Sequence, residues 1–485
     1  MSRVRFARMK ASAVGVLALA LTAASLGGQD RSPGDDPDVQ GAIRLFSAWL
    51  EGQIAYRELP GVVVGVVADQ ELVWAHGFGL ADIDTDRPMT RDTRFRMASH
   101  SKLFTATAIM QLREQGKIQL DDPVSDYLPW FQVQTAEPDD PPITIENLLT
   151  HSSGLPREAA AHWTTWEFPT EEELRNLIPE RQAPFSPEVR WKYSNLAYTI
   201  AGMIIEEVSG KSWAEYIQTN IFEPLGMTSS SVDQDVEGLA RGYSSRMRDG
   251  SRAARPFVDA RGMAAATGLT STVEDMAKFV SAQFRKGPRG EDRILSTASL
   301  REMHRVRMLE STWTRGQGIG FGVNRVDDKV YVGHGGGYPG YTTRTTIQLD
   351  SKVGVIVLTN TNDSNPGQIA QQLMTTVGEA VAEATEVSPD VVAWNPAWER
   401  FAGLYRSPSG GEQQVVLLNE RLVIISARAL NVDNPTELEP LGDGVFRFVS
   451  PTGGGPVGER IRFVEEDGEV VRMFVGDSFL DRVRD

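Results

Sequence analysis

The sequence predicts an α/β protein, more closely an α+β protein, in which helices flank an antiparallel sheet and a small all-β domain follows. Its 485 residues exceed one ordinary domain, so we expect two. Helical and strand patterns are mixed over residues 38–387, whereas residues 397–485 contain only short alternating strands. With 41% hydrophobic and 24% charged residues, the composition is that of a globular protein.

Residues 1–27 have the pattern of a secretory signal and are excluded from the expected fold. The basic residues come first: Arg3, Arg5, Arg8 and Lys10. The run Ala11–Leu26 that follows is apolar but short for a membrane span. We therefore expect an exported protein, periplasmic or extracellular, without stable membrane insertion once residues 1–27 are removed. The chain has no cysteine, which excludes disulfides and thiolate chemistry.

The mixed domain follows a polar segment, residues 28–37, and begins with a helix predicted over residues 38–56 by its apolar spacing. Later segments have strand patterns bounded by turn residues: Gly61–Val67, Leu72–Gly77, Thr342–Leu349 and Val353–Thr359. Between these strand pairs, residues 117–260 show helical segments interrupted by Pro, Trp and Gly. A final helix is predicted over residues 366–384. The first and last helices should then cover one face of the sheet.

A linker at Pro389–Pro396 precedes the β-domain. Short alternating strands follow it: Gln413–Leu418, Leu422–Ser426, Val445–Val449 and Arg460–Val464. Asp467-Gly468 is a strong hairpin signal between residues 460–466 and 469–475. This spacing indicates a small closed or sandwich β-domain. No residue in it suggests catalysis, so it serves either to shape the substrate cleft or to add stability.

Ser99-His100-Ser101-Lys102 is the most informative stretch for function. It opens a predicted helix that continues to Gly116, and residues three apart share a helix face, so Lys102 can reach Ser99 Oγ. An amine held neutral by its surroundings can take the proton of a serine nucleophile. The free N–H groups at a helix start also suit an oxyanion. A single S-x-x-K match is a weak signal.

Two further motifs follow in order along the chain. They are Tyr193-Ser194-Asn195 and His334-Gly335-Gly336. Together with S-x-x-K they make the three-part signature of penicillin-recognising serine hydrolases. The Tyr-x-Asn form resembles class C β-lactamases, DD-peptidases and their esterase and D-aminopeptidase relatives.

The connecting segments extend this resemblance. Similar stretches in the family match Leu148–Pro156 (LLTHSSGLP), Pro224–Met227 (PLGM) and Gly268–Thr272 with Glu274-Asp275-Met276. On these motifs the chain is identified as a member of the family over about residues 40–385. The resemblance implies a β-lactamase/transpeptidase-like fold and, in D-aminopeptidase-like relatives, an appended lipocalin-like barrel.

The resemblance also implies a role for each motif residue. Ser99 would be the nucleophile that forms an acyl-enzyme, and Tyr193 the general base. Lys102 would help to take the serine proton and, as a nearby cation, lower the pKa of Tyr193. Which of Lys102 and Tyr193 moves the proton stays open. The oxyanion hole would use the backbone N–H groups of Ser99 and Gly337.

The remaining motif residues would bind substrate: Asn195, His334 and Gly336. His334 and Gly335 depart from the Lys-Thr pair of the lactamase form, which argues against efficient penicillin hydrolysis because histidine is mostly neutral near pH 7. His151 is expected to be a buried hydrogen-bonding residue rather than a base. We expect no cofactor and no metal.

The sequence thus predicts an exported serine hydrolase that cleaves small esters or amides through an acyl-serine intermediate. The nearest alternative is a D-amino-acid-specific peptidase (aminopeptidase or DD-carboxypeptidase), followed by a weak β-lactamase. A different class of alternative is an inactive relative that binds peptidoglycan or a partner protein. The net charge of −16 argues against nucleic acid as a partner, and the oligomeric state stays open.

Overall fold

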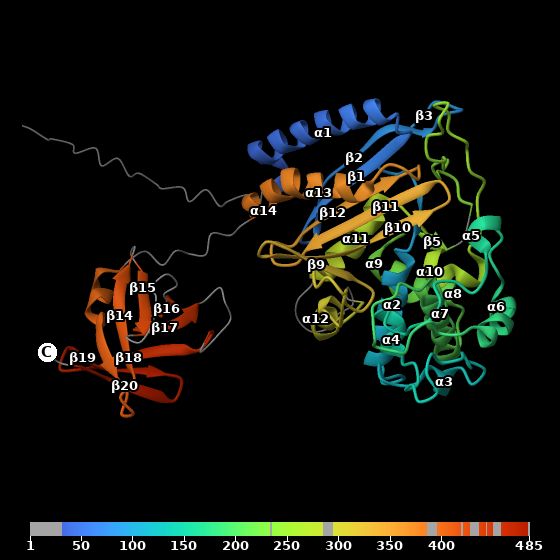
Figure 1. The fold of residues 1–485 in the computed structure, drawn as a ribbon. Helices are drawn as coiled ribbons and strands as arrows, with labels where there is room; N and C mark the ends of the chain where they lie inside the picture. Colours follow the sequence, from blue (N-terminus) through green and yellow to red (C-terminus); the bar gives the residue numbers. More distant parts are fainter. Residues whose placement is uncertain are drawn as a thin grey trace, which may run out of the picture. The chain divides into compact units, whose positions relative to one another are not determined.

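The computed structural model describes residues 32–232, 235–284, 294–385, 395–418, 421–426, 436–442, 444–449 and 457–483. They form two compact units, with the division between Glu386 and Val387 (Figure 1). The predicted signal at residues 1–27 and most of the predicted linker lie outside the described residues. Within the described ranges, no helix combines the length and the apolar character needed to cross a bilayer.

The first unit is built on a nine-stranded sheet of order β3-β2-β1-β12-β11-β10-β9-β8-β7, in which neighbouring strands run antiparallel. Its strands are β1 Gly61–Ala68, β2 Glu71–Asp82, β3 Arg87–Pro88, β7 Met308–Leu309, β8 Arg315–Gln317, β9 Gly322–Val326, β10 Lys329–Tyr338, β11 Tyr341–Gln348 and β12 Val353–Thr359. Every residue of β1 and of β12 is buried, because helices cover both faces at the centre of the sheet. The predicted antiparallel sheet is confirmed.

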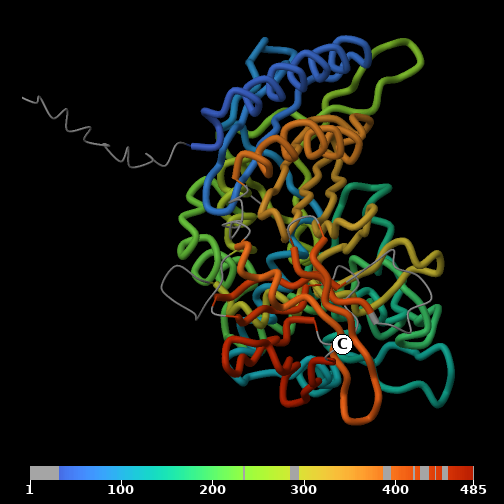
Figure 2. Tube along the Cα trace, turned by 90° about the vertical axis from the view of Figure 1, so that its left-hand side faces the viewer, coloured from blue at the N-terminus to red at the C-terminus, as the bar shows by residue number. Residues whose placement is uncertain are grey.

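The first and last helices of this unit pack on the same face of the sheet, as predicted. They are α1 Pro37–Arg57 and the continuous segment α13 Pro366–Leu373, η5 Met374–Gly378 and α14 Glu379–Thr385. The Asp36 carboxylate caps α1 by accepting from the N–H groups of Asp38 and Val39. The two helical segments lie side by side in both views (Figure 1, Figure 2). Their apolar sides, with the residues of β1 and β12 that face them, form one core.

The opposite face carries the helical region and the larger core. Its longer helices are α2 Ser101–Glu114, α7 Asn195–Ser209, α11 Val273–Phe284 and α12 Thr297–His304. Shorter ones are α3 Val124–Tyr127, α4 Ile145–Leu149, α5 His162–Thr165, α6 Glu171–Leu177, α8 Trp213–Ile217, α9 Glu223–Leu225 and α10 Ala264–Thr267. A small sheet of order β4-β6-β5 joins this region to the main sheet (β4 Phe95–Ala98, β5 Ser231–Val232, β6 Leu269–Ser271).

The second unit is a closed antiparallel barrel of β13–β20. Its strands are β13 Gly403–Arg406, β14 Glu412–Leu418, β15 Arg421–Ser426, β16 Thr436–Gly442, β17 Val445–Val449, β18 Arg460–Glu466, β19 Glu469–Val475 and β20 Ser478–Arg482. The ring closes through the pairs Tyr405–Arg482 and Arg406–Asp481. The Arg482 guanidinium donates to the carbonyls of Arg400 and Ala402 and so holds this seam together.

Candidate active site

Ser99 lies in the turn between β4 and α2, two residues before the helix begins. The helix that was predicted to open at Ser99 therefore begins two residues later. Ala98, directly before it, has a φ of 51°, a left-handed conformation that costs energy for a residue with a Cβ. This sharp reversal directs Ser99 towards the helical region, where Lys102 and Tyr193 meet it.

Lys102 is fully buried and its amine has a complete set of oxygen partners. Nζ lies 3.1 Å from Ser99 Oγ, 2.8 Å from Asn195 Oδ1 and 2.9 Å from the carbonyl oxygen of Ala266. Burial lowers the pKa of Lys102 well below its ordinary value, although the charge of Glu158 partly opposes the shift. The amine donates to all three oxygens, and its lowered pKa makes the deprotonated form easier to reach than in an exposed lysine.

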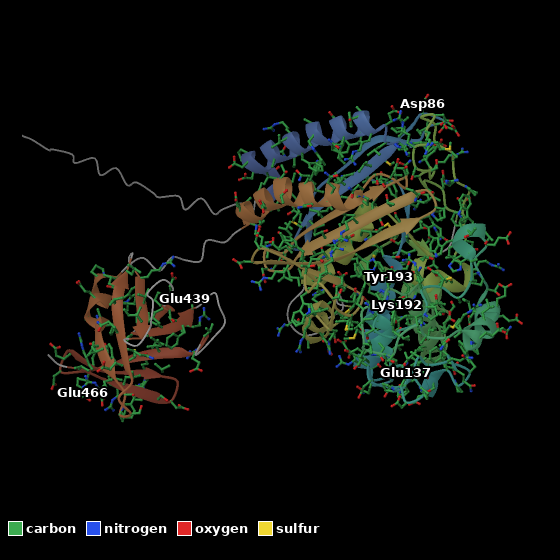
Figure 3. The ribbon with its side chains drawn as sticks, viewed as in Figure 1. Asp86, Glu137, Lys192, Tyr193, Glu439 and Glu466 are labelled. Carbon is green, nitrogen blue, oxygen red and sulfur yellow. The ribbon has the colours of Figure 1, made fainter. Side chains whose placement is uncertain are left out.

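Tyr193 precedes α7 and lies at the boundary between the sheet and the helical region (Figure 3). Its hydroxyl donates to Ser99 Oγ over 2.8 Å. Burial raises the pKa of Tyr193 above its ordinary value, although the hydrogen bond with Ser99 and the charge of Arg157 act the other way. The expected lowering of this pKa by Lys102 is not among the causes of the shift, which burial dominates. In the structure the Tyr193 phenol donates to Ser99 Oγ, and the Lys102 amine lies within hydrogen-bond distance of the same oxygen.

His151 supports the tyrosine and is not positioned as a base. Its Nδ1 accepts from the Ser194 N–H over 3.1 Å, and its ring lies 4.3 Å from the Tyr193 ring. Burial lowers the pKa of this fully buried histidine well below its ordinary value, so it stays neutral. The Ser194 hydroxyl accepts from the Ala197 N–H and caps α7. Together these contacts fix the Tyr-x-Asn motif at the helix start.

Glu158 is a residue of this site that sequence reasoning missed. Its carboxylate accepts hydrogen bonds from Asn195 Nδ2, from Trp163 Nε1 over 2.8 Å and from His162 Nε2 over 3.1 Å. Burial acts to raise the pKa of Glu158, but these hydrogen bonds lower it below its ordinary value. The anion therefore orients the Asn195 amide, so that its oxygen faces Lys102. The one available signal was position, since Glu158 follows the Leu148–Pro156 motif by two residues.

The His334-Gly335-Gly336 triplet lies within β10. A Cβ at Gly336 would come closer than 3.0 Å to Thr343 Oγ1 and to the Met97 carbonyl, so only glycine lets β10 approach β4 and the turn that carries Ser99. A Cβ at Gly337 would meet nothing within 4 Å. The half-buried His334 ring lies 6.3 Å from the Tyr193 ring. Burial lowers the pKa of His334 well below its ordinary value, with Lys102 contributing, so the ring is neutral.

Two pockets, each of about 260 Å³, flank this centre. One is lined by Trp163, Trp166, Arg255, Gly337, Tyr338, Pro339 and Asn362. The other extends from Tyr193 and His334 along β10 to the ends of β8 and β9 and includes Trp191, Arg315 and Arg344. A substrate bound at Ser99 therefore has one pocket beside Gly337 and another beside Tyr193.

The family model described as Beta-lactamase matches residues 46–374, which include every element of this centre. The chain belongs to the beta-lactamase family. As a beta-lactamase-family protein it is a serine hydrolase, with esterase-like and D-peptidase-like relatives. The family fold predicted from the motifs is confirmed, and so is the appended antiparallel barrel.

Three comparisons illustrate the range of this hydrolase family. The chain is 27% identical over 397 residues to Penicillin-binding protein 4* of Bacillus subtilis (strain 168), covering 75% of this chain and 83% of that protein. It is 30% identical over 324 residues to Esterase EstB of Burkholderia gladioli, covering 58% of this chain and 78% of that protein. The octameric penicillin-binding protein homologue from Pyrococcus abyssi is similar with a TM-score of 0.62 and 26% identity, covering 90% of this chain and 99% of that chain.

The direction of the two pKa shifts predicts how activity of this hydrolase depends on pH. Protonated Lys102 has no lone pair for the Ser99 proton, so kcat/KM for an ester should rise as pH rises through the lowered pKa of Lys102. Ionisation of Tyr193 would remove the phenol proton, but its raised pKa places that loss above the ordinary tyrosine range. Initial rates measured across pH should show an acid limb and a broad plateau. A profile that is highest in acid and falls towards neutral pH would contradict this assignment.

Proposed function

We propose that this protein is an exported serine hydrolase that cleaves small esters or amides through an acyl-enzyme on Ser99. The observation that carries the proposal is that Ser99 Oγ lies 3.1 Å from the Lys102 amine and 2.8 Å from the Tyr193 hydroxyl. A buried neutral amine and a phenol on either side of one hydroxyl supply both a base and an acid. Export is supported by the basic and apolar pattern of residues 1–27.

In the acylation step Ser99 Oγ forms a bond to the carbonyl carbon, and its proton passes to Lys102 Nζ. The negative charge on the carbonyl oxygen is stabilised by the N–H groups of Ser99 and Gly337. When the tetrahedral intermediate collapses, the bond to the leaving atom breaks and Tyr193 gives that atom its proton. The products of this step are the acyl-serine, the free alcohol or amine, an ammonium at Lys102 and a phenolate at Tyr193.

Deacylation returns both protons. A water molecule attacks the acyl carbon and loses its proton to the Tyr193 phenolate. The ester bond to Ser99 then breaks, and its oxygen takes the proton held by Lys102. The carboxylic acid leaves, and the serine, amine and phenol regain their starting states, so that one water is consumed for each bond cleaved.

Esters are favoured over D-amino-acid peptides as substrates by one observation of the site and one of the comparisons. The half-buried His334 is kept neutral, which leaves the motif without the cation of the lactamase form. Esterase EstB is among the relatives, with 30% identity. Steady-state cleavage of p-nitrophenyl acetate and of D-alanine p-nitroanilide separates the two candidates. A higher kcat/KM for the anilide would establish the peptidase instead.

Covalent labelling tests whether Ser99 is the nucleophile. We expect a fluorophosphonate probe to label the purified protein at Ser99, and p-nitrophenyl acetate to be hydrolysed. Ser99→Ala should lose both, while Ser101→Ala is the matched control. The Ser101 hydroxyl donates to the Ala98 carbonyl and accepts from the Leu269 N–H, and it has no contact with the Lys102 amine among the hydrogen bonds described, so this variant keeps the nucleophile although it loses two structural hydrogen bonds. A folded wild-type protein that is neither labelled nor active would favour the alternative of a non-catalytic binding protein.

A further inference from the structure

Arg96 is a buried cation that the mechanism above does not use. It belongs to β4, three residues before Ser99, and only 1% of its surface is exposed. A guanidinium stays charged in proteins, and taking a charge out of water costs free energy. The contacts that Arg96 makes must offset this cost, and they lie next to the proposed oxyanion hole.

The Arg96 guanidinium joins three segments of the first unit to β4. Its Cζ lies 4.8 Å from the centre of the Tyr338 ring, at the end of β10, and 5.0 Å from the centre of the Phe257 ring, in a loop. Arg96 Nη1 donates to the Gly268 carbonyl over 3.2 Å, just before β6. A cation is attracted to the face of an aromatic ring more strongly where water is excluded. The strand that leads to Ser99 is thereby held against the end of β10.

Gly337 supplies the second donor of the proposed oxyanion hole, and no side chain of its own anchors it. A Cβ at Gly337 would meet nothing within 4 Å, so beyond its pairing with β11 the direction of its N–H group depends on how its two neighbours in β10 are held. On one side, Gly336 is fixed by its close approach to the Met97 carbonyl. On the other side is Tyr338, whose ring Arg96 contacts. Both neighbours of Gly337 are therefore held by residues of β4.

We propose that Arg96 is a positioning residue of the oxyanion hole. Through the Tyr338 ring it fixes the end of β10 against β4, so that the N–H groups of Ser99 and Gly337 converge on one oxygen. The inference rests on the proposed function, which assigns these two donors. Such donors stabilise developing charge because they are oriented in advance, and a displacement of about 1 Å is enough to lose much of the effect. Arg96 lines neither of the pockets beside Ser99, so it acts on the reaction through β4 and β10.

Two esters that differ in one atom test this inference on the full chain. p-Nitrophenyl acetate and its thiono analogue, with C=S in place of C=O, have the same leaving group, but sulfur is larger and accepts hydrogen bonds weakly. The ratio of their kcat/KM values therefore measures the oxyanion hole, and we expect the wild-type protein to favour the oxygen ester. Arg96→Met should lower kcat/KM for the oxygen ester about tenfold or more and leave the thiono ester within about threefold. Arg96→Lys, which keeps a cation but not the planar group, should give an intermediate ratio.

Two further variants separate positioning from a loss of stability. Arg113→Met makes the same replacement in α2, where it removes an ion pair with Glu302, and should keep the wild-type ratio whatever its Tm. Tyr338→Leu removes the ring that Arg96 contacts and should lower the ratio as Arg96→Met does, so it also serves if Arg96→Met fails to fold.

The outcomes distinguish this inference from the proposed function. Equal losses on both esters in Arg96→Met, an unchanged ratio in Tyr338→Leu, or a wild-type ratio near one would overturn the inference and leave the proposed function standing. If the wild-type protein hydrolyses neither ester in a Ser99-dependent way, the proposed function fails and the inference fails with it.

Discussion

Lys102→Met is expected to lower kcat/KM for p-nitrophenyl acetate by about 10²–10⁴-fold, the usual contribution of a positioned base. Methionine is similar in length to lysine and apolar, so the fully buried site can accept it without a new charge. The Asn195 and Ala266 oxygens each lose a donor, at a cost of about 1–3 kcal/mol per unsatisfied group. Burial of an amine also costs free energy of desolvation, and the methionine variant avoids that cost. This gain offsets part of the stability lost at the two oxygens.

Activity and stability should therefore separate in this variant. Circular dichroism should show a folded protein with a modest change in Tm, while initial rates fall to near the background. Lys117→Met is the matched control, because Lys117 is exposed three residues beyond the end of α2 and its replacement should leave the rate unchanged. A Lys102→Met protein with a rate within threefold of wild type would remove the amine from the proposed mechanism and leave Tyr193 as the base.

Gly336→Ala is expected to have the second largest effect, through geometry and not through chemistry. Its new Cβ would come closer than 3.0 Å to Thr343 Oγ1 and the Met97 carbonyl, so β10 must move away from β4. Overpacking of this kind costs about 1–3 kcal/mol. A displacement of about 1 Å between reacting groups can cost about 10²-fold in rate. Both Tm and kcat should fall.

The neighbouring glycine is a control within the same strand. Gly337→Ala keeps the N–H group assigned to the oxyanion hole and adds a Cβ that meets nothing within 4 Å. Its Tm should stay close to that of wild type, and Tm is the quantity compared because Gly337 also lines a substrate pocket. Similar losses of Tm in the Gly336 and Gly337 variants would show that the clash with Thr343 and Met97 is not the cause, and that β10 is sensitive to any side chain.

The sequence predicted the contact between those site residues that lie close together along the chain. Ser99, in the turn before α2, and Lys102, in its first turn, are three residues apart, and this spacing allows the distance of 3.1 Å between their side chains. The approach of Tyr193 could be expected from motif order, but its geometry required the fold. Which of Lys102 and Tyr193 moves the proton does not follow from spacing, because burial lowers the pKa of Lys102 and burial raises the pKa of Tyr193.

The strands and the site residue that were not predicted have no local sequence pattern that indicates them. β10 contains three consecutive glycines, which are typical of a turn, and it is a strand only because β4 and β11 pack closely against it. β7 and β8 are edge strands of two and three residues. Glu158 lies in an irregular loop, and its contacts with His162 and Asn195 depend on segments from different parts of the chain. Pairings of this kind require tertiary structure.

The pairing of β13 with β20, which closes the barrel of the second unit, has a consequence for how that unit folds. The ladder is completed by strands 403–406 and 478–482, the two that are most distant along the unit, and only two residue pairs join them. Until they meet, any partly assembled ring presents two rows of unpaired N–H and C=O groups, which are templates for intermolecular pairing. Non-local closure is slow compared with hairpin formation. Assembly of this unit should therefore be all-or-none, with its greatest risk of association between molecules just before the two ends of the ladder join.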